Sequence, residues 1–195
     1  LVIAPKSITG TWTDLRQVYG DGKTADIRLN GLAAGDEDVN AAITGPNGEA
    51  VDALTAVGTY ALTAAVNSNY TLTNGTATLV IEKRPVHFTV SDNAVTPGDE
   101  PTITTDPAGI EGEYTITYRD EDGNEFDTLP EEPGEYEIWV EFDADSSYQP
   151  AGGGTEQPIG TVTVSPQPQA LYRVSFDGNG ADTAPAALEV AGGSQ

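Results

Sequence analysis

The stretch GEYEIWVEF, residues 134–142, alternates apolar and polar positions without a break. A period of two is that of a β-strand with one buried and one exposed face. The apolar face carries Tyr136, Ile138, Val140 and Phe142, and the other face carries Glu135, Glu137, Trp139 and Glu141. We therefore predict a strand through the centre of a core, with its acidic face toward solvent.

The same pattern occurs once before, in residues 58–66, where Tyr60, Leu62, Ala64 and Val66 share a face. Other landmarks recur in the same order at offsets of 75 to 78 residues. Leu1 recurs as Leu79, Gly20-Asp21 as Gly98-Asp99, Gly48 as Gly123, Gly58-Thr59-Tyr60 as Gly134-Glu135-Tyr136, and Asn69-Tyr70 as Ser147-Tyr148. Matches in one consistent order indicate an internal repeat.

This period suggests the domain organisation. We expect a first β repeat over 1–84, in which residues 1–5 are the closing strand of a preceding unit, and a second, acidic β repeat over 85–166. A Pro/Gln linker follows, and Pro favours extended, stiff backbone there. Residues 170–195 would then be an incomplete third repeat of β-grasp type.

Turn residues complete the fold prediction. The chain has 22 Gly and 13 Pro, which is typical of short strands joined by many turns. Asn74-Gly75 and Asp122-Gly123 each separate two strand-like runs, so we predict a hairpin at both. No amphipathic helix of three turns is evident. We predict an all-β chain of two tandem Ig-like β-sandwich modules plus a partial C-terminal β segment.

Composition excludes several classes of partner. The net charge is −23, which repels nucleic acid and anionic membrane surfaces. Residues 1–84 have a net charge of −3 and residues 85–169 one of −18. Cys is absent, and no apolar run approaches the roughly 20 residues of a membrane span. We expect no membrane insertion, no nucleic-acid partner, and a monomeric piece of a longer protein, since Met and a signal peptide are also absent.

The acidic second repeat suggests two readings. Ca²⁺ prefers several carboxylate oxygens, and the candidate ligands are Asp120, Asp122 and Asp127, or Asp143 and Asp145. However, the Gly of Asp120-Glu121-Asp122-Gly123 stands at the fourth position, where an EF-hand loop has it at the sixth. We favour a solvated acidic face that keeps the protein soluble, and expect no cofactor.

Trp139 is the candidate binding residue, with Glu137 and Glu141 beside it. A Trp among surface carboxylates could stack on a sugar ring or fill a pocket of a partner protein. The alternative, which we favour, is that a loop or the neighbouring unit covers it. An enzyme is not expected, because the single His87 has no evident Ser, Asp or Cys partner and short repeats offer no cleft for paired carboxylates.

The order of several motifs resembles the YDG and MBG ("mostly β, glycine-rich") repeats. The motifs are VYGDG at 18–22, GLAAGD at 31–36, NYTL at 69–72, and LVIEK at 79–83. In the second repeat Pro97 replaces Tyr19, and the Gly35-Asp36 pair has no clear counterpart. Residues 172–180, YRVSFDGNG, with Ala184-Pro185, look like the start of a Listeria–Bacteroides repeat.

These resemblances imply a bacterial surface protein, secreted or anchored to the cell wall. They imply tandem modules with a spacer or adhesive role, and they carry no catalytic residues to this chain. A partner, if the modules bind one, would be a glycan or protein of a host or of a neighbouring cell. Two roles stay open, a structural stalk and a binding module acting through the second repeat.

Overall fold

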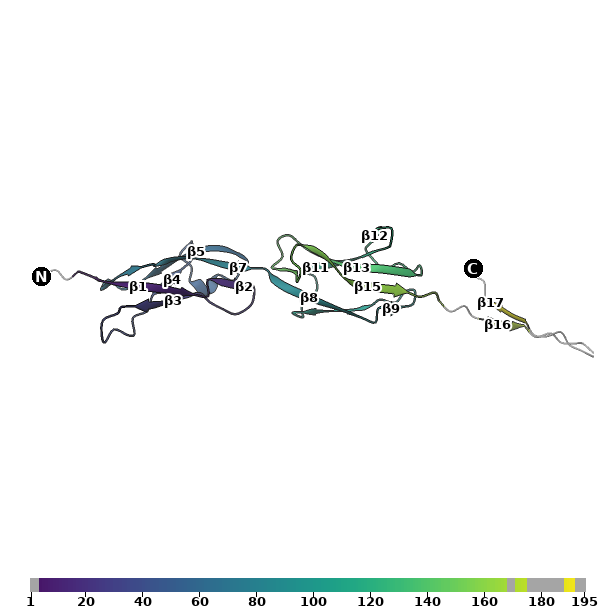
Figure 1. Ribbon diagram of the computed structural model, residues 1–195, viewed down its shortest axis with the longest axis horizontal. Helices are drawn as coiled ribbons and strands as arrows, with labels where there is room; N and C mark the ends of the chain where they lie inside the picture. The colour runs from purple at the N-terminus through teal and green to yellow at the C-terminus, as the bar shows by residue number, and fades with distance from the viewer. Residues whose placement is uncertain (1–3, 168–170, 175–187, 192–195) are drawn as a thin grey trace, which may run out of the picture. The chain divides into compact units, whose positions relative to one another are not determined.

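The computed structural model describes residues 4–167, 171–174 and 188–191 (Figure 1). Nearly all regular structure in these ranges is β-strand; the one helix among them is the three-residue 3-10 turn η1 (Val51–Ala53). The prediction of an all-β, sandwich-type chain is confirmed. Within the same ranges, no helix has the length and apolarity required to cross a membrane.

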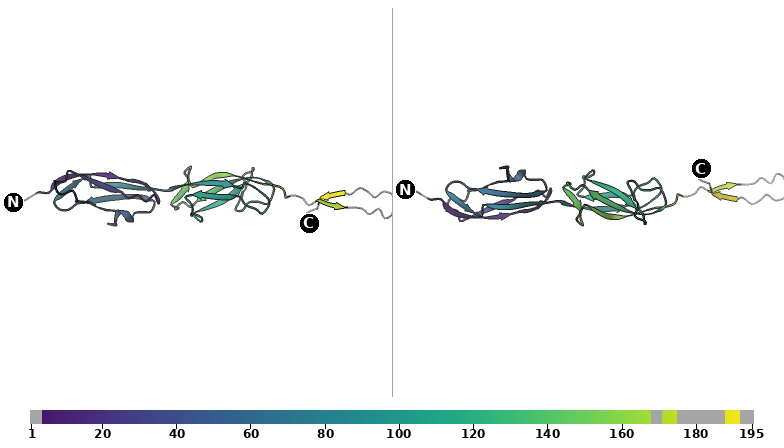
Figure 2. Two further views of the ribbon diagram at one scale, coloured as in Figure 1. Left: turned by 90° about the horizontal axis from the view of Figure 1, so that it is seen from below. Right: turned by 90° about the horizontal axis from the view of Figure 1, so that it is seen from above.

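The first seven strands form two sheets, seen from two further sides in Figure 2. One sheet has the order β3-β1-β6 and comprises β1 (Lys6–Thr13), β3 (Asp26–Asn30) and β6 (Tyr70–Thr73). The other has the order β2-β7-β5-β4 and comprises β2 (Arg16–Val18), β4 (Ala42–Thr44), β5 (Gly58–Ala65) and β7 (Thr76–Glu82). Their core includes Ala25, Leu54, Leu62, Leu79 and Ile81, with Trp12 packed against it.

The next eight strands repeat this arrangement. One sheet has the order β10-β8-β14 and comprises β8 (Arg84–Ser91), β10 (Thr102–Asp106) and β14 (Tyr148–Pro150). The other has the order β12-β11-β13-β15-β9 and comprises β9 (Ala94–Val95), β11 (Tyr114–Arg119), β12 (Glu125–Phe126), β13 (Gly134–Phe142) and β15 (Glu156–Val164). A second apolar cluster contains Val95, Tyr118, Tyr136, Ile138, Val162 and Val164.

Strand pairing recurs with the period of the sequence repeat. β1 pairs in parallel with β6, with Lys6 opposite Tyr70, and β8 pairs in parallel with β14, with Arg84 opposite Tyr148. Both partners are displaced by 78 residues. The edge strand of the larger sheet is also parallel to the closing strand in each case, β2 to β7 and β9 to β15. The internal repeat is therefore a repeat of topology and register as well as of residues.

The alternating strands β13 and β5 bury the faces that the sequence predicts. On β13, Tyr136, Ile138, Val140 and Phe142 are at most 6% exposed, whereas the three Glu side chains between them are exposed. On β5, Leu62 and Ala64 are buried and Tyr60 is half-buried. Alternation alone was enough to assign these faces, because both strands are interior strands of their sheets.

Each of these strands begins with the same Gly-x-Tyr contact. The Tyr60 hydroxyl donates a hydrogen bond to the Ala56 carbonyl (2.9 Å), and the Tyr136 hydroxyl donates one to the Glu132 carbonyl (3.0 Å), four residues back in both cases. The ring lies so close to the preceding glycine that a Cβ at Gly58 would stand 3.3 Å from the Tyr60 Cζ atom. The glycine thus gives the ring room to fold back over the turn.

One of the two predicted hairpins is confirmed. β11 and β12 are antiparallel, with Arg119 opposite Glu125, and residues 120–124 connect them. The Gly123 N–H donates to the Asp120 carbonyl (3.0 Å), and Gly123 has a φ of +80°. A β-turn followed by a glycine of positive φ is one of the common hairpin loops.

The hairpin predicted at Asn74-Gly75 is wrong. β6 and β7, on either side of it, belong to different sheets. Asn74 has a φ of +59°, and the carbonyl of Gly75 already accepts a hydrogen bond from Ala64 of β5 (2.7 Å). The chain therefore crosses from one sheet to the other at this point. An Asn-Gly pair signals a sharp change of direction, but the direction depends on which strands are free to pair.

Contacts between Cα atoms divide the chain into two compact units. The first comprises Leu1–Phe88, Thr105–Thr115 and Val140–Gln157, and the second comprises Thr89–Thr104, Ile116–Trp139 and Pro158–Gln195. The first unit holds the core of β1 to β7 and an aromatic group in which Phe88, Tyr114 and Phe142 contact one another. The second unit holds the cluster around Ile138.

The C-terminal segment is described only in part. β16 (Leu171–Val174) and β17 (Leu188–Ala191) are antiparallel, with Tyr172 opposite Val190. The remainder of the predicted third repeat lies outside the described residues. So do residues 1–3 of the predicted leading strand, and Ala4 and Pro5 are not in a strand.

Candidate functional site

The predicted binding face on β13 is partly covered by its neighbouring strand. Trp139 is half-buried, and the guanidinium carbon of Arg119 on β11 lies 3.9 Å from the centre of its ring. The Trp139 Nε1–H donates to the Glu137 carboxylate (3.0 Å). The Trp139 ring is thus covered in part by the cationic side chain of Arg119, which comes from a neighbouring strand of the same sheet. Such a cation–π contact stabilises both side chains.

Arg119 is also held by an acidic side chain on the neighbouring strand. Its Nε and Nη2 atoms donate to Glu125 Oε2 at 3.1 and 2.8 Å, across the β11–β12 hairpin. Glu125 lies opposite Arg119 in the strand register. The cation is therefore held by a cross-strand carboxylate while its flat face meets Trp139. The sequence analysis proposed Trp139 as a site residue but did not propose Arg119. Arg119 is the only Lys or Arg between residues 85 and 169, and this could have drawn attention to it.

Arg119 also lines a hollow of about 710 Å³. Two segments line it, residues 119–123 from the hairpin loop and residues 133–137 from the start of β13. The structure thus brings the candidates Glu137, Asp120 and Asp122 to one hollow. Trp139 and Glu141 are not among its lining residues. Five carboxylates and one guanidinium give the lining a negative charge.

Asp120 uses its carboxylate to hold the hairpin loop. Its Oδ1 accepts hydrogen bonds from the backbone N–H of Asp122 (3.0 Å) and Asn124 (2.8 Å), and its Oδ2 accepts one from Asn124 Nδ2 (2.8 Å). The side-chain amide of Asn124, followed by these backbone donors, lowers the pKa of Asp120 from its ordinary value of 3.8. The side chain predicted as a calcium ligand thus has a structural role in the turn.

The other predicted calcium ligands are exposed. Asp127 follows β12, while Asp143 and Asp145 lie in the turn between β13 and β14, where the Asp143 carbonyl accepts a hydrogen bond from Ser146 (3.0 Å). In the described part of the chain, no three His, Cys, Asp or Glu side chains are grouped so as to hold a metal ion. Calcium binding stays a prediction for calorimetry, in which heat on adding Ca²⁺ would support it.

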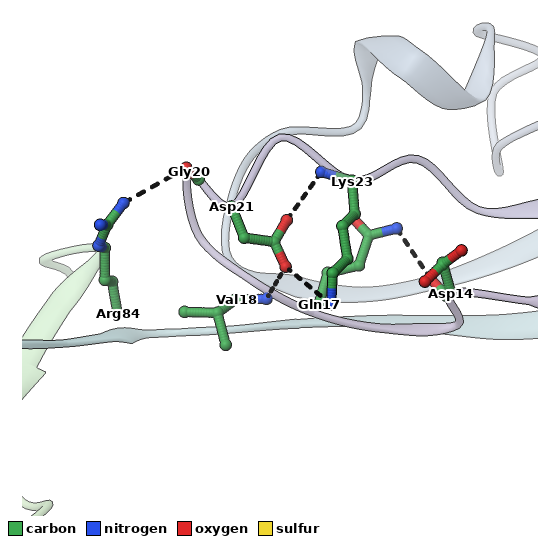
Figure 3. A network of polar contacts seen from close by, with 7 residues as sticks. All are labelled: Asp14, Gln17, Val18, Gly20, Asp21, Lys23 and Arg84. Carbon is green, nitrogen blue, oxygen red and sulfur yellow. Dashed lines mark hydrogen bonds and ion pairs between the residues drawn. The ribbon is translucent and has the colours of Figure 1, made fainter.

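A second polar site surrounds the loop after β2 (Figure 3). The Asp21 carboxylate accepts hydrogen bonds from the N–H groups of Lys23 (2.9 Å) and Val18 (3.2 Å), and the Lys23 ammonium lies 3.8 Å away. The Lys23 N–H is the main cause of a lowered Asp21 pKa. Gly20 and Gly22 have φ values of +71° and +73°, which favour glycine. The YGDG motif therefore builds a loop held closed by Asp21.

This loop meets the chain where it leaves β7. Arg84 Nη1 donates to the carbonyl of Gly20 (3.3 Å), as Figure 3 shows. The Tyr19 ring packs edge-on against Tyr148, with centroids 5.5 Å apart at 81°. The Lys83 ammonium donates to the carbonyl of Ala144 (2.8 Å). All these residues belong to the first compact unit, and the sequence offered no signal that paired Tyr19 with Tyr148.

Residues 9–85 of the chain match the family model of the MBG domain. The matched stretch spans most of β1 to β7, contains the loop at 19–22, and ends just after the passage from β7 to β8. The match supports the MBG part of the resemblance seen in the sequence. No curated protein matches the chain.

Proposed function

From the match of residues 9–85 to the MBG domain, we propose that this chain is a non-catalytic, structural stretch of a bacterial cell-surface or adhesin-like protein. Residues 1–84 and 85–166 would serve as successive spacer modules of a stalk, secreted or anchored to the cell wall. Residues 170–195 would begin a further repeat, of the Listeria–Bacteroides type.

The main support for this proposal is that one arrangement of strands occurs twice with different surface charges. Both sets of strands have the same order in the smaller sheet and the same parallel pairs, down to the register of Lys6 with Tyr70 and of Arg84 with Tyr148. The larger sheet of the second set adds one strand, β12, to the corresponding order of the first. Their net charges are −3 and −18. A frame that persists while the surface changes is expected of modules whose shared task is mechanical.

The chemistry of the hollow also favours a non-catalytic role. A glycosidase needs one carboxyl group whose pKa is raised so that it stays protonated and can act as an acid. The pKa of Asp120 in the hollow is instead lowered by its turn contacts. Its oxygens accept three hydrogen bonds from the loop that it closes.

A spacer predicts a length that grows in proportion to the number of modules. Small-angle X-ray scattering tests this on the single 195-residue chain and on fusions of two and three copies in series. The largest dimension of each is measured. A stiff spacer gives equal increments for each copy. Increments that shrink as copies are added would show flexible joints and contradict the proposal.

A second candidate function is binding, supported by the hollow that Arg119 lines and by the Trp139 ring under the same Arg119 guanidinium. The partner would be a glycan or protein of a host or neighbouring cell, contacted by the second repeat. A glycan array and a cell-binding assay with the intact chain test this. Saturable binding that Glu137→Gln abolishes and Glu141→Gln preserves would favour it, since Glu137 lines the hollow and Glu141 does not.

A further inference from the structure

In each sheet of the first sandwich, one of the first two strands lies beside one of the last two. The chain enters through β1 and β2 and leaves through β6 and β7. β1 is parallel to β6 in the smaller sheet, and β2 is parallel to β7 in the larger one. The entering and leaving segments therefore run side by side and in the same direction twice.

Backbone hydrogen bonds join the two segments in both sheets. In the smaller sheet the Lys6 N–H donates to the Asn69 carbonyl (2.9 Å). In the larger sheet the Val80 N–H donates to the Leu15 carbonyl (2.9 Å), and the Tyr19 N–H donates to the Glu82 carbonyl (2.9 Å). Side-chain hydrogen bonds add to these links, among them those of Thr73 to Ile8, Arg16 to Glu82, and Trp12 to Asn74.

The Trp12 contact joins the places where the two segments change sheets. β1 passes to β2 at Asp14, whose φ is +53°, and β6 passes to β7 at Asn74, whose φ is +59°. The indole Nε1–H of Trp12 donates to the Asn74 carbonyl (2.8 Å). The side chain of Gln17, which is 6% exposed, donates to the Asp14 carbonyl (2.8 Å) and braces the first crossover.

The second set of strands repeats this device. β8 is parallel to β14, with a hydrogen bond from Arg84 N–H to the Ser147 carbonyl (2.9 Å), and β9 is parallel to β15, with one from Thr163 N–H to the Asn93 carbonyl (2.8 Å). Asp92, between β8 and β9, has a φ of +53°, as Asp14 does 78 residues earlier. The same crossover thus recurs at the matching position.

We propose that these parallel pairs act as a shear clamp, which makes each sandwich resist unfolding by a force along the chain. Tension pulls the entering strand toward its N-terminal end and the leaving strand toward its C-terminal end. For parallel neighbours these directions are opposed along the strand axis, so the hydrogen bonds between them are loaded together. An antiparallel pair pulled from adjacent ends opens one bond at a time.

A shear clamp is a property of the strand pairing and goes beyond the spacer role. A spacer is required only to span a distance. A clamp implies in addition that the chain transmits a pulling force from its N-terminal to its C-terminal end. Force applied in a direction that does not shear the parallel pairs should therefore unfold the sandwich much more easily.

Single-molecule force spectroscopy on the full 195-residue chain tests the clamp. The chain contains no Cys, so introduced Cys residues alone decide where force is applied. In the first geometry a Cys at each terminus shears both sandwiches. In the second, Thr55→Cys replaces the N-terminal attachment; Thr55 is exposed and precedes β5, whose first residue Gly58 lies opposite Ile81 of β7.

The second geometry peels β5 from β7. Residues 84–166 are still loaded in shear in this geometry, so their unfolding force serves as an internal reference. An extended residue spans about 3.5 Å, so the unfolded first sandwich has a contour length of about 270 Å between its ends and about 100 Å from Thr55. This difference in length identifies the unfolding event. We expect its unfolding force to drop well below that of the reference in the second geometry. Equal forces in both geometries would overturn the clamp.

A matched pair of substitutions assigns the effect to the parallel pairs. Trp12→Phe keeps an aromatic ring and removes the donor to Asn74, so the unfolding force of the first sandwich should fall with terminal attachment and stay unchanged with attachment at Thr55. Trp139→Phe, on β13 and outside both parallel pairs, should change neither. An equal loss in both geometries for Trp12→Phe would show general destabilisation and refute the assignment. The scattering increments of the spacer test do not depend on these forces, so either idea can fail alone.

Discussion

Replacing Tyr136 with Phe tests the contact that begins the central strand of the second repeat. The change removes one hydroxyl, which donates to the Glu132 carbonyl at 3.0 Å, and keeps the ring that covers Gly134. Tyr136 is 6% exposed, so its hydroxyl has little access to water in the folded state. Glu132 is exposed, so its carbonyl can bind water in the variant.

The expected cost follows from these two facts. A net intramolecular hydrogen bond contributes about 1 kcal/mol, and the exposed acceptor should keep the loss near that figure. For a module of this size a loss of about 1 kcal/mol lowers the Tm by roughly 4–8 °C. Tyr60→Phe should cost less, because Tyr60 is half-buried and water already competes for its hydroxyl.

Urea denaturation and calorimetry of the full chain measure both changes. Tyr19→Phe is the control, since Tyr19 contacts Tyr148 through its ring. Burial raises the pKa of Tyr136 above its ordinary value of 10.0. A raised folded pKa means stability that is present below pH 10 and lost as the pH rises through the folded value, so the difference between wild type and Tyr136→Phe should shrink at high pH. No change in Tm on removing the Tyr136 hydroxyl would refute the idea that its hydrogen bond to Glu132 stabilises the second repeat.

Three further predictions concern the turn, the core and the loop at 19–22. The pKa of Asp120 is lowered chiefly by Asn124, so its contribution to stability is present above the ordinary value of 3.8 and lost as the pH falls through the lower folded value. Asp120→Asn should therefore lower the Tm at pH 6 but converge with wild type below pH 3.8, and a constant difference in pH-dependent melting curves would contradict the carboxylate's role. Ile138→Ala, at a fully buried position, should cost about 2–5 kcal/mol in urea denaturation, whereas Glu135→Ala on the exposed side should stay within about 0.5 kcal/mol. A double-mutant cycle of Tyr19→Leu and Tyr148→Leu should give a coupling of about 0.5–1.5 kcal/mol, as edge-on aromatic pairs do, and additive effects would show that the contact contributes nothing.

The predicted binding residues show how much of a site local sequence patterns can reveal. The sequence placed Trp139 and Glu137 on the outer face of a strand and named Asp120 and Asp122 in the next turn. It could not show that the hairpin brings Glu137 and both Asp side chains to one hollow, or that Arg119 lies over Trp139. Those contacts depend on the register between β11 and its neighbours. Register is decided only when strands pair, so the sequence of one strand does not reveal it.

What the sequence determined by itself was local and periodic. Alternation assigned the faces of β5 and β13, Gly and Asp residues located the hairpin at 120–124, and the 78-residue offset identified two copies of one frame. Only the tertiary structure decided that Asn74-Gly75 crosses between sheets and that the entering and leaving strands lie parallel. Parallel partners are separated by more than sixty residues of chain, and their choice depends on which sheet edges the other strands leave open. No local pattern of side chains records that choice, and the proposed clamp depends on it.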